Sequence, residues 1–189
     1  LVSISMVHKL KGHYLDTKHP IIVENLMGIK RVKGSIQKGK KPILINHLKS
    51  IINVIDEQKI ESIKKFRDKS IILVGFGGGF RRTELTSIDY EDLEFVPEGL
   101  KIIIKRSKTD QFGEGMIKGL PYFTNEKYCP VFNLKKWLEI SKIKSGSIFR
   151  RFSKGSSLTD KRLTDQSVVL LMKEYLNLAG IENKNYAGH

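Results

Sequence analysis

Three short β-type segments follow one another in the middle of a chain whose other ordered stretches have helical periodicity. These apolar runs lie at 93–96, 100–106 and 116–123, separated by a Pro-Glu-Gly turn and by a polar loop at 107–115. Short connections of this kind join antiparallel neighbours, so the segments predict a three-stranded meander. The chain is therefore expected to have an α+β fold, mainly helical with one small antiparallel sheet.

Amphipathic helices are expected before and after these strands in the sequence. Leu44 to Ile55 and Ile63 to Val74 carry apolar residues at helical spacing. Pro130 suits the first turn of another helix, and Thr164 suits the N-cap of a last one that ends near Gly180. The expected buried positions are Leu44, Leu48, Ile51, Ile52, Ile55, Val131, Leu134, Trp137, Leu138, Ile143, Val168, Leu171, Met172, Tyr175 and Leu176.

The N-terminal stretch is expected to be separate from the main domain at 42–189. Residues 1–29 have helical pieces around a break at His19-Pro20 and are too few to hold a core alone. Residues 30–41 are interpreted as a flexible basic linker that can follow a phosphate backbone, the alternative being a solvated tether with no partner. The expected buried face of the first stretch is Ile21, Ile22, Val23 and Leu26. The basic residues of the linker are Lys30, Arg31, Lys33, Lys38, Lys40 and Lys41.

The net charge points to a polyanionic partner. Thirty-four Lys and Arg against 20 Asp and Glu give a formal net charge of +14. Each cation that meets a phosphate releases condensed counterions, which favours nucleic-acid binding. A ribosomal, RNA-binding or merely solubilising surface is the alternative, because charge alone does not separate these classes.

Cysteine usage and hydropathy indicate the compartment. The single cysteine, Cys129, excludes an internal disulfide and favours a reducing environment, and its apolar neighbours predict a buried, inert thiol. The longest nearly uncharged stretch, Ser70 to Phe80, is far shorter than the ~20 apolar residues that span a bilayer. No signal peptide is visible. A cytoplasmic protein without a membrane segment is expected.

Nothing in the sequence has the pattern of a cofactor or metal site. The glycine run Gly75–Gly79 lacks the ending of a phosphate-binding loop, and Phe80 breaks a dinucleotide fingerprint, so close helix packing or a tight bend is expected there. There is no Cys/His pair at zinc spacing. One acidic cluster is interpreted as capping and solvent-facing rather than metal-binding: Asp89, Glu91, Asp92 and Glu94.

Phosphate chemistry without a metal needs fixed cations, and two positions fit. Arg81 stands at an expected helix start, where backbone N–H groups favour anions, and its guanidinium can hold two phosphate oxygens at once. Glu84 shares a helix face with Arg81 and can orient it, although an ordinary surface ion pair is the alternative. Lys108, in the polar loop, can deliver a proton to a leaving oxygen, but by itself it is one of many lysines.

Four motifs together resemble the tyrosine recombinase (phage integrase) family. Gly79–Leu85 looks like its first arginine motif, and Ile88–Leu93 like the segment that leads into the sheet. Arg106–Asp110 resembles the hairpin with the active-site lysine, and Tyr186–His189 the opening of the second signature box. The resemblance covers roughly 42–189 and implies the DNA breaking-rejoining fold. It also implies that 1–29 is the end of a helical core-binding domain.

The resemblance implies roles for these residues. Arg81 stabilises the five-coordinate phosphorus, Lys108 protonates the departing 5′ oxygen, His189 positions the phosphate or transfers a proton, and Glu84 supports the site. A family tyrosine attacks the phosphate to form a 3′-phosphotyrosyl link, so neither a cofactor nor a metal is required. The expected partner is double-stranded DNA, on which the full-length parent is expected to act as a homo-oligomer (a tetramer in the family) at the nucleoid, although the sequence itself leaves the oligomeric state open. Expected DNA contacts beyond the linker lysines and arginine are Arg82 and Arg106.

The chain departs from the family pattern at its end. The second arginine and the attacking tyrosine lie beyond His189 in the family, and a packing role is expected for Tyr186. We therefore expect a truncated catalytic domain that binds DNA weakly and does not cleave it. A recombinase relative that has lost catalysis and an unrelated RNA-binding protein are the alternatives. The sequence leaves integration, excision and dimer resolution open.

Overall fold

The computed structural model of the chain describes residues 1–34, 41–58, 63–105, 115–182 and 186. The chain divides into two compact units, Leu1–Gly39 and Lys40–His189, and each is described by itself below. No helix among the described residues is long and apolar enough to cross a membrane.

The first unit consists of two helices, α1 (Val2–Leu10) and α2 (Pro20–Lys33). Neither helix has a buried residue, which confirms that this stretch holds no core of its own. The expected buried face is therefore wrong: Ile21 is 63% exposed, and Ile22, Val23 and Leu26 are only half-buried, because two helices offer too little surface to cover them. The assignment of residues 1–29 to a core-binding domain stays a prediction.

Residues 30–33, which were expected to open a flexible linker, are helical in the structure. Lys30, Arg31 and Lys33 form the last turn of α2, which ends at Gly34 with a φ of 72°. Lysine and arginine have high helix propensity, and cations in a last turn interact favourably with the helix dipole, so these residues extend the helix. The basic side chains here are therefore exposed on a helix rather than on a flexible segment.

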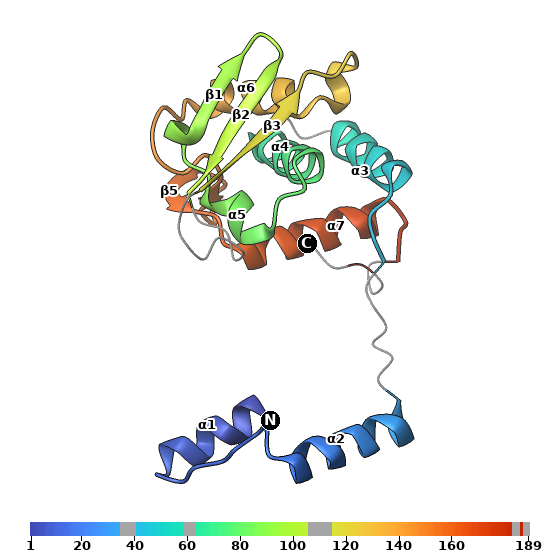
Figure 1. The fold of residues 1–189 in the computed structure, drawn as a ribbon. Coiled ribbons are helices and arrows are strands. Elements are labelled where there is room, and N and C mark those ends of the chain that lie inside the picture. The colour runs from blue at the N-terminus through green and yellow to red at the C-terminus, as the bar shows by residue number, and fades with distance from the viewer. Residues whose placement is uncertain (35–40, 59–62, 106–114, 183–185, 187–189) are drawn as a thin grey trace. The chain divides into compact units, whose positions relative to one another are not determined.

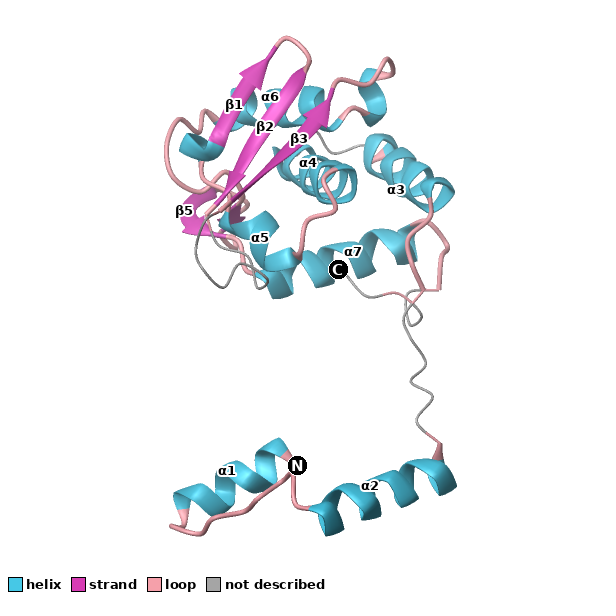
Figure 2. Ribbon diagram, viewed as in Figure 1, coloured by secondary structure: helices cyan, strands magenta, loops and turns pink. Residues whose placement is uncertain are grey.

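The second unit combines helices with two small antiparallel sheets (Figures 1 and 2). Its helices are α3 (Ile45–Glu57), α4 (Ile63–Gly77), α5 (Arg82–Ser87), α6 (Pro130–Ser141) and α7 (Asp165–Leu178), with 3₁₀ turns η1 (Tyr90–Asp92) and η2 (Glu126–Tyr128). Its strands are β1 (Leu93–Val96), β2 (Gly99–Ile104), β3 (Met116–Pro121), β4 (Arg150–Phe152) and β5 (Leu158–Arg162). Helix α4 is central, because it contacts α3, α5, α6 and α7. The expected mainly helical α+β fold is confirmed.

The three-stranded sheet has the predicted antiparallel order β1-β2-β3. In β2, Leu100, Ile102 and Ile104 are buried while the residues between them are exposed, as a strand with one face on the core requires. Gly99 pairs with Pro121, and a Cβ atom at Gly99 would lie 2.0 Å from the Leu120 carbonyl oxygen. Only glycine fits at this turn.

The core confirms most of the expected positions. The buried hydrophobic residues come from α3, α4, α6, α7 and the inner face of the sheet, and they include Cys129 at 1% exposure. Trp137 is fully buried, and its indole N–H donates to the Ile148 carbonyl oxygen at 2.8 Å. Leu44 is an exception at 57% exposure, because it precedes α3 as its N-cap. Thr164 caps α7 as expected, accepting from the Ser167 amide at 3.2 Å.

A buried ionic network joins α4 to α7. Arg67 Nη2 lies 2.6 Å from Asp68 Oδ1, and the Tyr175 hydroxyl donates to Asp68 Oδ2 at 3.0 Å. Arg67 also donates to the Arg150 carbonyl oxygen at 2.9 Å and lies over the Phe152 ring. Asp68 is fully buried and Arg67 is 5% exposed, so each charge depends on the other for compensation.

The buried carboxylate gives the chain a pH-dependent stability. Burial raises the pKa of the Asp68 carboxyl above its ordinary 3.8, outweighing the neighbouring Arg67 guanidinium. The folded state therefore binds this proton more tightly than the unfolded state, and stability is lost as pH rises through the folded pKa. The unfolding free energy of the unchanged chain, minus that of an Asp68→Asn variant, should fall as pH increases from below 3.8. Urea titrations followed by Trp137 fluorescence measure this difference, and a rise with pH would contradict it.

Candidate active site

A glycine bend delivers Arg81 to the surface of the second unit. Helix α4 ends at Gly77, Gly79 has a φ of 55°, and the Phe80 amide returns to the Gly75 carbonyl oxygen at 3.1 Å. A Cβ atom at Gly78 would lie 2.2 Å from the Phe80 ring. The buried Phe80 side chain thus anchors the bend, which confirms the structural interpretation of the glycine run.

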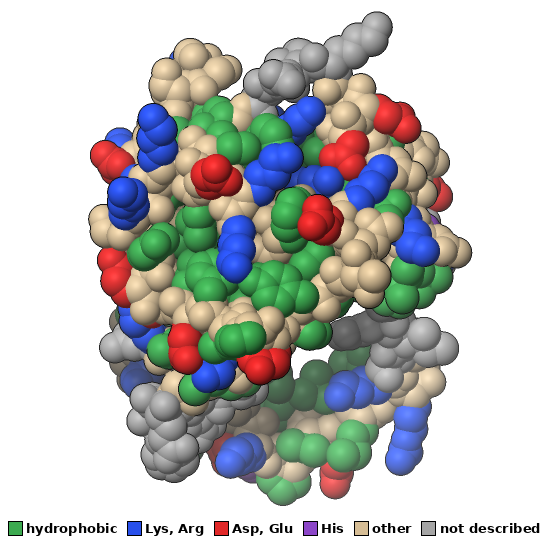
Figure 3. All heavy atoms as spheres, turned by 90° about the horizontal axis from the view of Figure 1, so that it is seen from above, with side chains coloured by type: hydrophobic (Ala, Val, Ile, Leu, Met, Phe, Trp, Pro, Cys, Tyr) green, Lys and Arg blue, Asp and Glu red, His purple; other side chains and the backbone are tan. Residues whose placement is uncertain are grey.

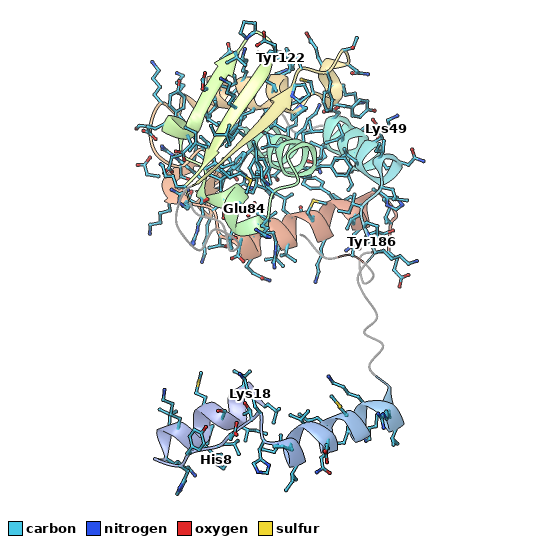
Figure 4. The ribbon with its side chains drawn as sticks, in the orientation of Figure 1. His8, Lys18, Lys49, Glu84, Tyr122 and Tyr186 are labelled. Atoms are coloured by element: carbon cyan, nitrogen blue, oxygen red, sulfur yellow. The ribbon has the colours of Figure 1, made fainter. Side chains whose placement is uncertain are left out.

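Arg81 and Glu84 form a pair that differs from an ordinary surface ion pair. Arg81 Nη1 lies 2.9 Å from Glu84 Oε1, and the Arg81 amide donates to Glu84 Oε2 at 3.1 Å. The Glu84 side chain is only 3% exposed, whereas that of Arg81 is 48% exposed. A buried carboxylate therefore holds a half-exposed guanidinium, the arrangement expected of a group oriented for an external anion. Figure 4 shows Glu84 on α5, beneath the three-stranded sheet.

The N-terminus of α5, where backbone N–H groups were predicted to favour anions, contributes little to anion binding. Helix α5 has six residues, and Glu84 of its own first turn already accepts from the Arg81 amide. So short a helix has a small macrodipole. Attraction for an anion here rests on the Arg81 guanidinium.

Lys118 is part of this site, although no motif in the sequence indicated it. Its ammonium lies 3.3 Å from Glu84 Oε2 and donates to the Gly78 and Gly79 carbonyl oxygens at 3.1 and 3.0 Å. Lys118 is on β3, 34 residues after Glu84. The sequence predicted the strand that carries Lys118, but no local spacing connects this residue with the arginine motif.

A cavity of about 440 Å³ opens beside Arg81. Most of its wall is apolar and comes from α3, α4 and α7, including Ile72, Phe76 and Met172. Lys41 and Arg81 both line it, so the structure brings one linker lysine to the arginine motif.

The other expected site residues fall into three groups. Lys30, Arg31 and Lys33 belong to the first unit, while Arg82 is the half-buried first residue of α5. The remaining expected site residues lie outside the described residues: Lys108, His189, Lys38, Lys40 and Arg106.

The acidic cluster makes structural contacts. Asp92 accepts from the Asp89 amide at 3.0 Å and pairs with Lys105 at 2.7 Å. Asp89 also pairs with Arg162 at 2.5 Å, and Glu91 accepts from the Gly146 amide. The hydrogen bond to Asp92 raises the pKa of the Lys105 ammonium and outweighs the opposing effect of burial. Among the described residues no group of three or more His, Cys, Asp or Glu is arranged to hold a metal ion.

Tyr186 packs on the second unit. Its ring centroid lies 5.4 Å from that of His47 in α3, and its backbone bridges to Lys41. Figure 4 shows its position near the beginning of α3. These contacts agree with the packing role expected from the sequence.

Positive and negative side chains are mixed on one face of the molecule. Figure 3 shows one face, on which Lys and Arg side chains alternate with Asp, Glu and hydrophobic side chains. This face has no segregated cationic surface, and the candidate site rests on the specific contacts of Arg81.

Comparison with known proteins adds a homologue. No protein-family model matches the chain. An integrase/recombinase from Selenomonas ruminantium, described as a XerD homolog, is 40% identical over 178 residues, which are 94% of this chain and 51% of that protein. The chain thus spans about half the length of this relative.

Solved structures share the fold. A crystal structure of XerA recombinase matches with a TM-score of 0.55 and 15% identity, covering all of this chain and 62% of its own. XerH site-specific recombinase, bound to its difH substrate before cleavage, matches with a TM-score of 0.58 and 16% identity, covering 82% of this chain and 42% of its own. At these identities the likeness shows the fold alone.

Proposed function

Since the chain belongs to the tyrosine recombinase family, we propose that it is part of a site-specific DNA recombinase that cuts and rejoins strands through a phosphotyrosyl intermediate. The observation that carries this proposal is the Arg81–Glu84 pair, a half-exposed guanidinium held by a buried carboxylate. This pair stands in the arginine motif of a chain that is 40% identical to an integrase/recombinase.

Each proposed role follows from the chemistry of a phosphodiester. In-line attack concentrates negative charge on the non-bridging oxygens, and Arg81, already oriented by Glu84, stabilises that charge without reorganising. Lys108 supplies the proton for the departing 5′ oxygen, and His189 positions the phosphate or transfers a proton. In the proposed reaction a tyrosine attacks the phosphate, and the residues named here hold that phosphate and protonate its leaving group.

The proposed partner is double-stranded DNA, on which the whole protein acts as a homotetramer at the nucleoid. A net charge of +14 supports binding to a polyanion. The XerH recombinase, which shares this fold, is bound to its difH substrate in the crystal, and that complex supports the same kind of partner for this chain. Lys41 and Arg82 are proposed phosphate contacts next to Arg81, together with the exposed cations of α2.

The test uses a chimera, in which the chain is joined to the parts of the Selenomonas relative that lie outside the matched 178 residues. Incubated with duplex DNA that carries the recombination site of that relative, the chimera should form a covalent protein–DNA adduct. The adduct should survive denaturation and form in EDTA, because the bond is a phosphotyrosine and no metal takes part. Denaturing gel electrophoresis detects it. A chimera that folds and binds DNA but forms no adduct would contradict the proposal.

A non-catalytic DNA-binding relative is the second candidate. The observation that favours this candidate is the mostly apolar wall of the cavity beside Arg81, because apolar side chains form no polar contacts with a phosphate. In that case the chimera binds duplex DNA with a strong salt dependence and leaves it uncut. Preference for RNA over duplex DNA across several salt concentrations would instead indicate an RNA-binding protein.

A further inference from the structure

The Lys118 ammonium has a full set of hydrogen-bond acceptors. A lysine ammonium has three N–H donors and no acceptor. Three oxygens surround Lys118 Nζ at 3.0 to 3.3 Å: those of Gly78, Gly79 and Glu84 Oε2. The Phe80 ring lies on a further side, with its centroid 4.3 Å away. The three N–H donors of Lys118 are therefore directed at protein oxygens rather than at a substrate.

The environment of Lys118 separates it from the surface lysines of the same sheet. Its side chain is 17% exposed, and its partner Glu84 is 3% exposed. Lys101 of the neighbouring strand pairs with Glu94, but these side chains are 46% and 58% exposed. Exposed pairs are screened by water and contribute little, whereas a partly desolvated cation beside a buried carboxylate interacts strongly.

The contacts of Lys118 connect three parts of the site. The two glycine carbonyls follow the end of α4, where the helix dipole favours a cation, and they belong to the bend that leads into Arg81. Glu84 is the residue that holds the Arg81 guanidinium. Lys118 itself belongs to β3, so its contacts tie the sheet to the glycine bend and to α5.

We propose that Lys118 is a positioning residue for the recombinase reaction: it fixes the glycine bend and Glu84, and through Glu84 it sets the orientation of Arg81. This inference rests on the proposed function for its effect on DNA cleavage. The positioning of Arg81 itself is a property of the chain and is measurable without DNA.

The first experiment observes Arg81 directly in the chain. The Nε–Hε resonance of Arg81 is assigned by its loss in Arg81→Lys and is then followed in Lys118→Met, Lys118→Arg and the matched control Lys101→Met. Lys118→Met should shift or broaden this resonance, because Glu84 loses its contact with the Lys118 cation. In Lys118→Arg the resonance should stay close to its position in the unchanged chain, and in Lys101→Met it should not move. An unaltered Arg81 resonance in folded Lys118→Met overturns the proposal.

The second experiment measures single-turnover DNA cleavage by the chimera. Lys118→Met should lower the rate constant at saturating DNA by about 10- to 100-fold with little change in affinity, the scale expected when a site group is displaced or loses a supporting contact. In an Arg81→Ala background the same change should cost almost nothing further, because Lys118 acts through Arg81. Additive losses in the double variant overturn the proposal.

Two safeguards keep the outcomes distinct. If Lys118→Met does not fold, Lys118→Gln decides, since its amide still donates to the glycine carbonyls but brings no charge to Glu84. If the Arg81 resonance moves as expected while the unchanged chimera forms no adduct, the proposed function fails and the positioning role of Lys118 stands.

Discussion

Arg81→Ala in the chimera should lower the rate of DNA cleavage by ~10²–10³-fold, the usual cost of removing one preorganised donor from a developing negative charge. The expected loss is in the rate at saturating DNA, because the guanidinium acts mainly on charge that appears in the transition state. Arg81→Lys should recover little, since an ammonium cannot hold two phosphate oxygens in one plane. Adduct formation under single-turnover conditions measures the effect.

The matched control for this prediction is Arg151→Ala. Arg151 is an exposed arginine on β4 whose side chain donates to the Arg162 carbonyl oxygen at 2.9 Å, a contact that involves neither Arg81 nor Glu84. It has the same charge as Arg81 and loses the same atoms when it is changed to alanine, so it reports the non-specific cost of removing a cation. Equal effects of the two substitutions would show that Arg81 is one phosphate contact among many.

Asp68→Ala should lower the free energy of unfolding of the chain by about 3–5 kcal/mol, because it leaves a charge buried without its counterion. Arg67 is 5% exposed and, among the described residues, would keep the Arg150 carbonyl oxygen alone as a hydrogen-bond partner. Tyr175→Phe removes one hydrogen bond to the same carboxylate and should cost about 1.5–3 kcal/mol. Urea unfolding followed by the fluorescence of the single tryptophan, Trp137, measures both.

A surface pair provides the comparison for Asp68. Asp160 lies 2.6 Å from Arg150, but its side chain is 98% exposed, so Asp160→Ala should leave the stability nearly unchanged. If Asp68→Ala proves as mild as Asp160→Ala, the network between α4 and α7 does not hold these helices together.

Local patterns in the sequence predicted the main elements. The meander, the helix that begins at Pro130 and the Thr164 cap were readable because short turns, proline and capping residues act within a few positions. The hairpin of β4 and β5 was not predicted. Its residues are mostly polar and half-exposed, so they lack the apolar alternation that indicates a strand.

The site was predictable only in part, because local spacing shows contacts between sequence neighbours but not contacts made by tertiary structure. Arg81 and Glu84 are three residues apart, and their contact follows from helix geometry. Lys118 reaches Glu84 through the pairing of three strands and the bend after α4, so its contribution depends on tertiary structure. The buried pair Arg67–Asp68 was likewise missed, because two charged neighbours in a helix give no local sign of burial.

The most direct test of this account is a crystal structure of the chimera on duplex DNA. We expect one phosphate to contact the Arg81 guanidinium, the Lys108 ammonium and the His189 imidazole together, each within about 3.2 Å of a phosphate oxygen. A complex in which these three groups contact different phosphates, or point to different faces of the protein, would contradict the assignment of the site.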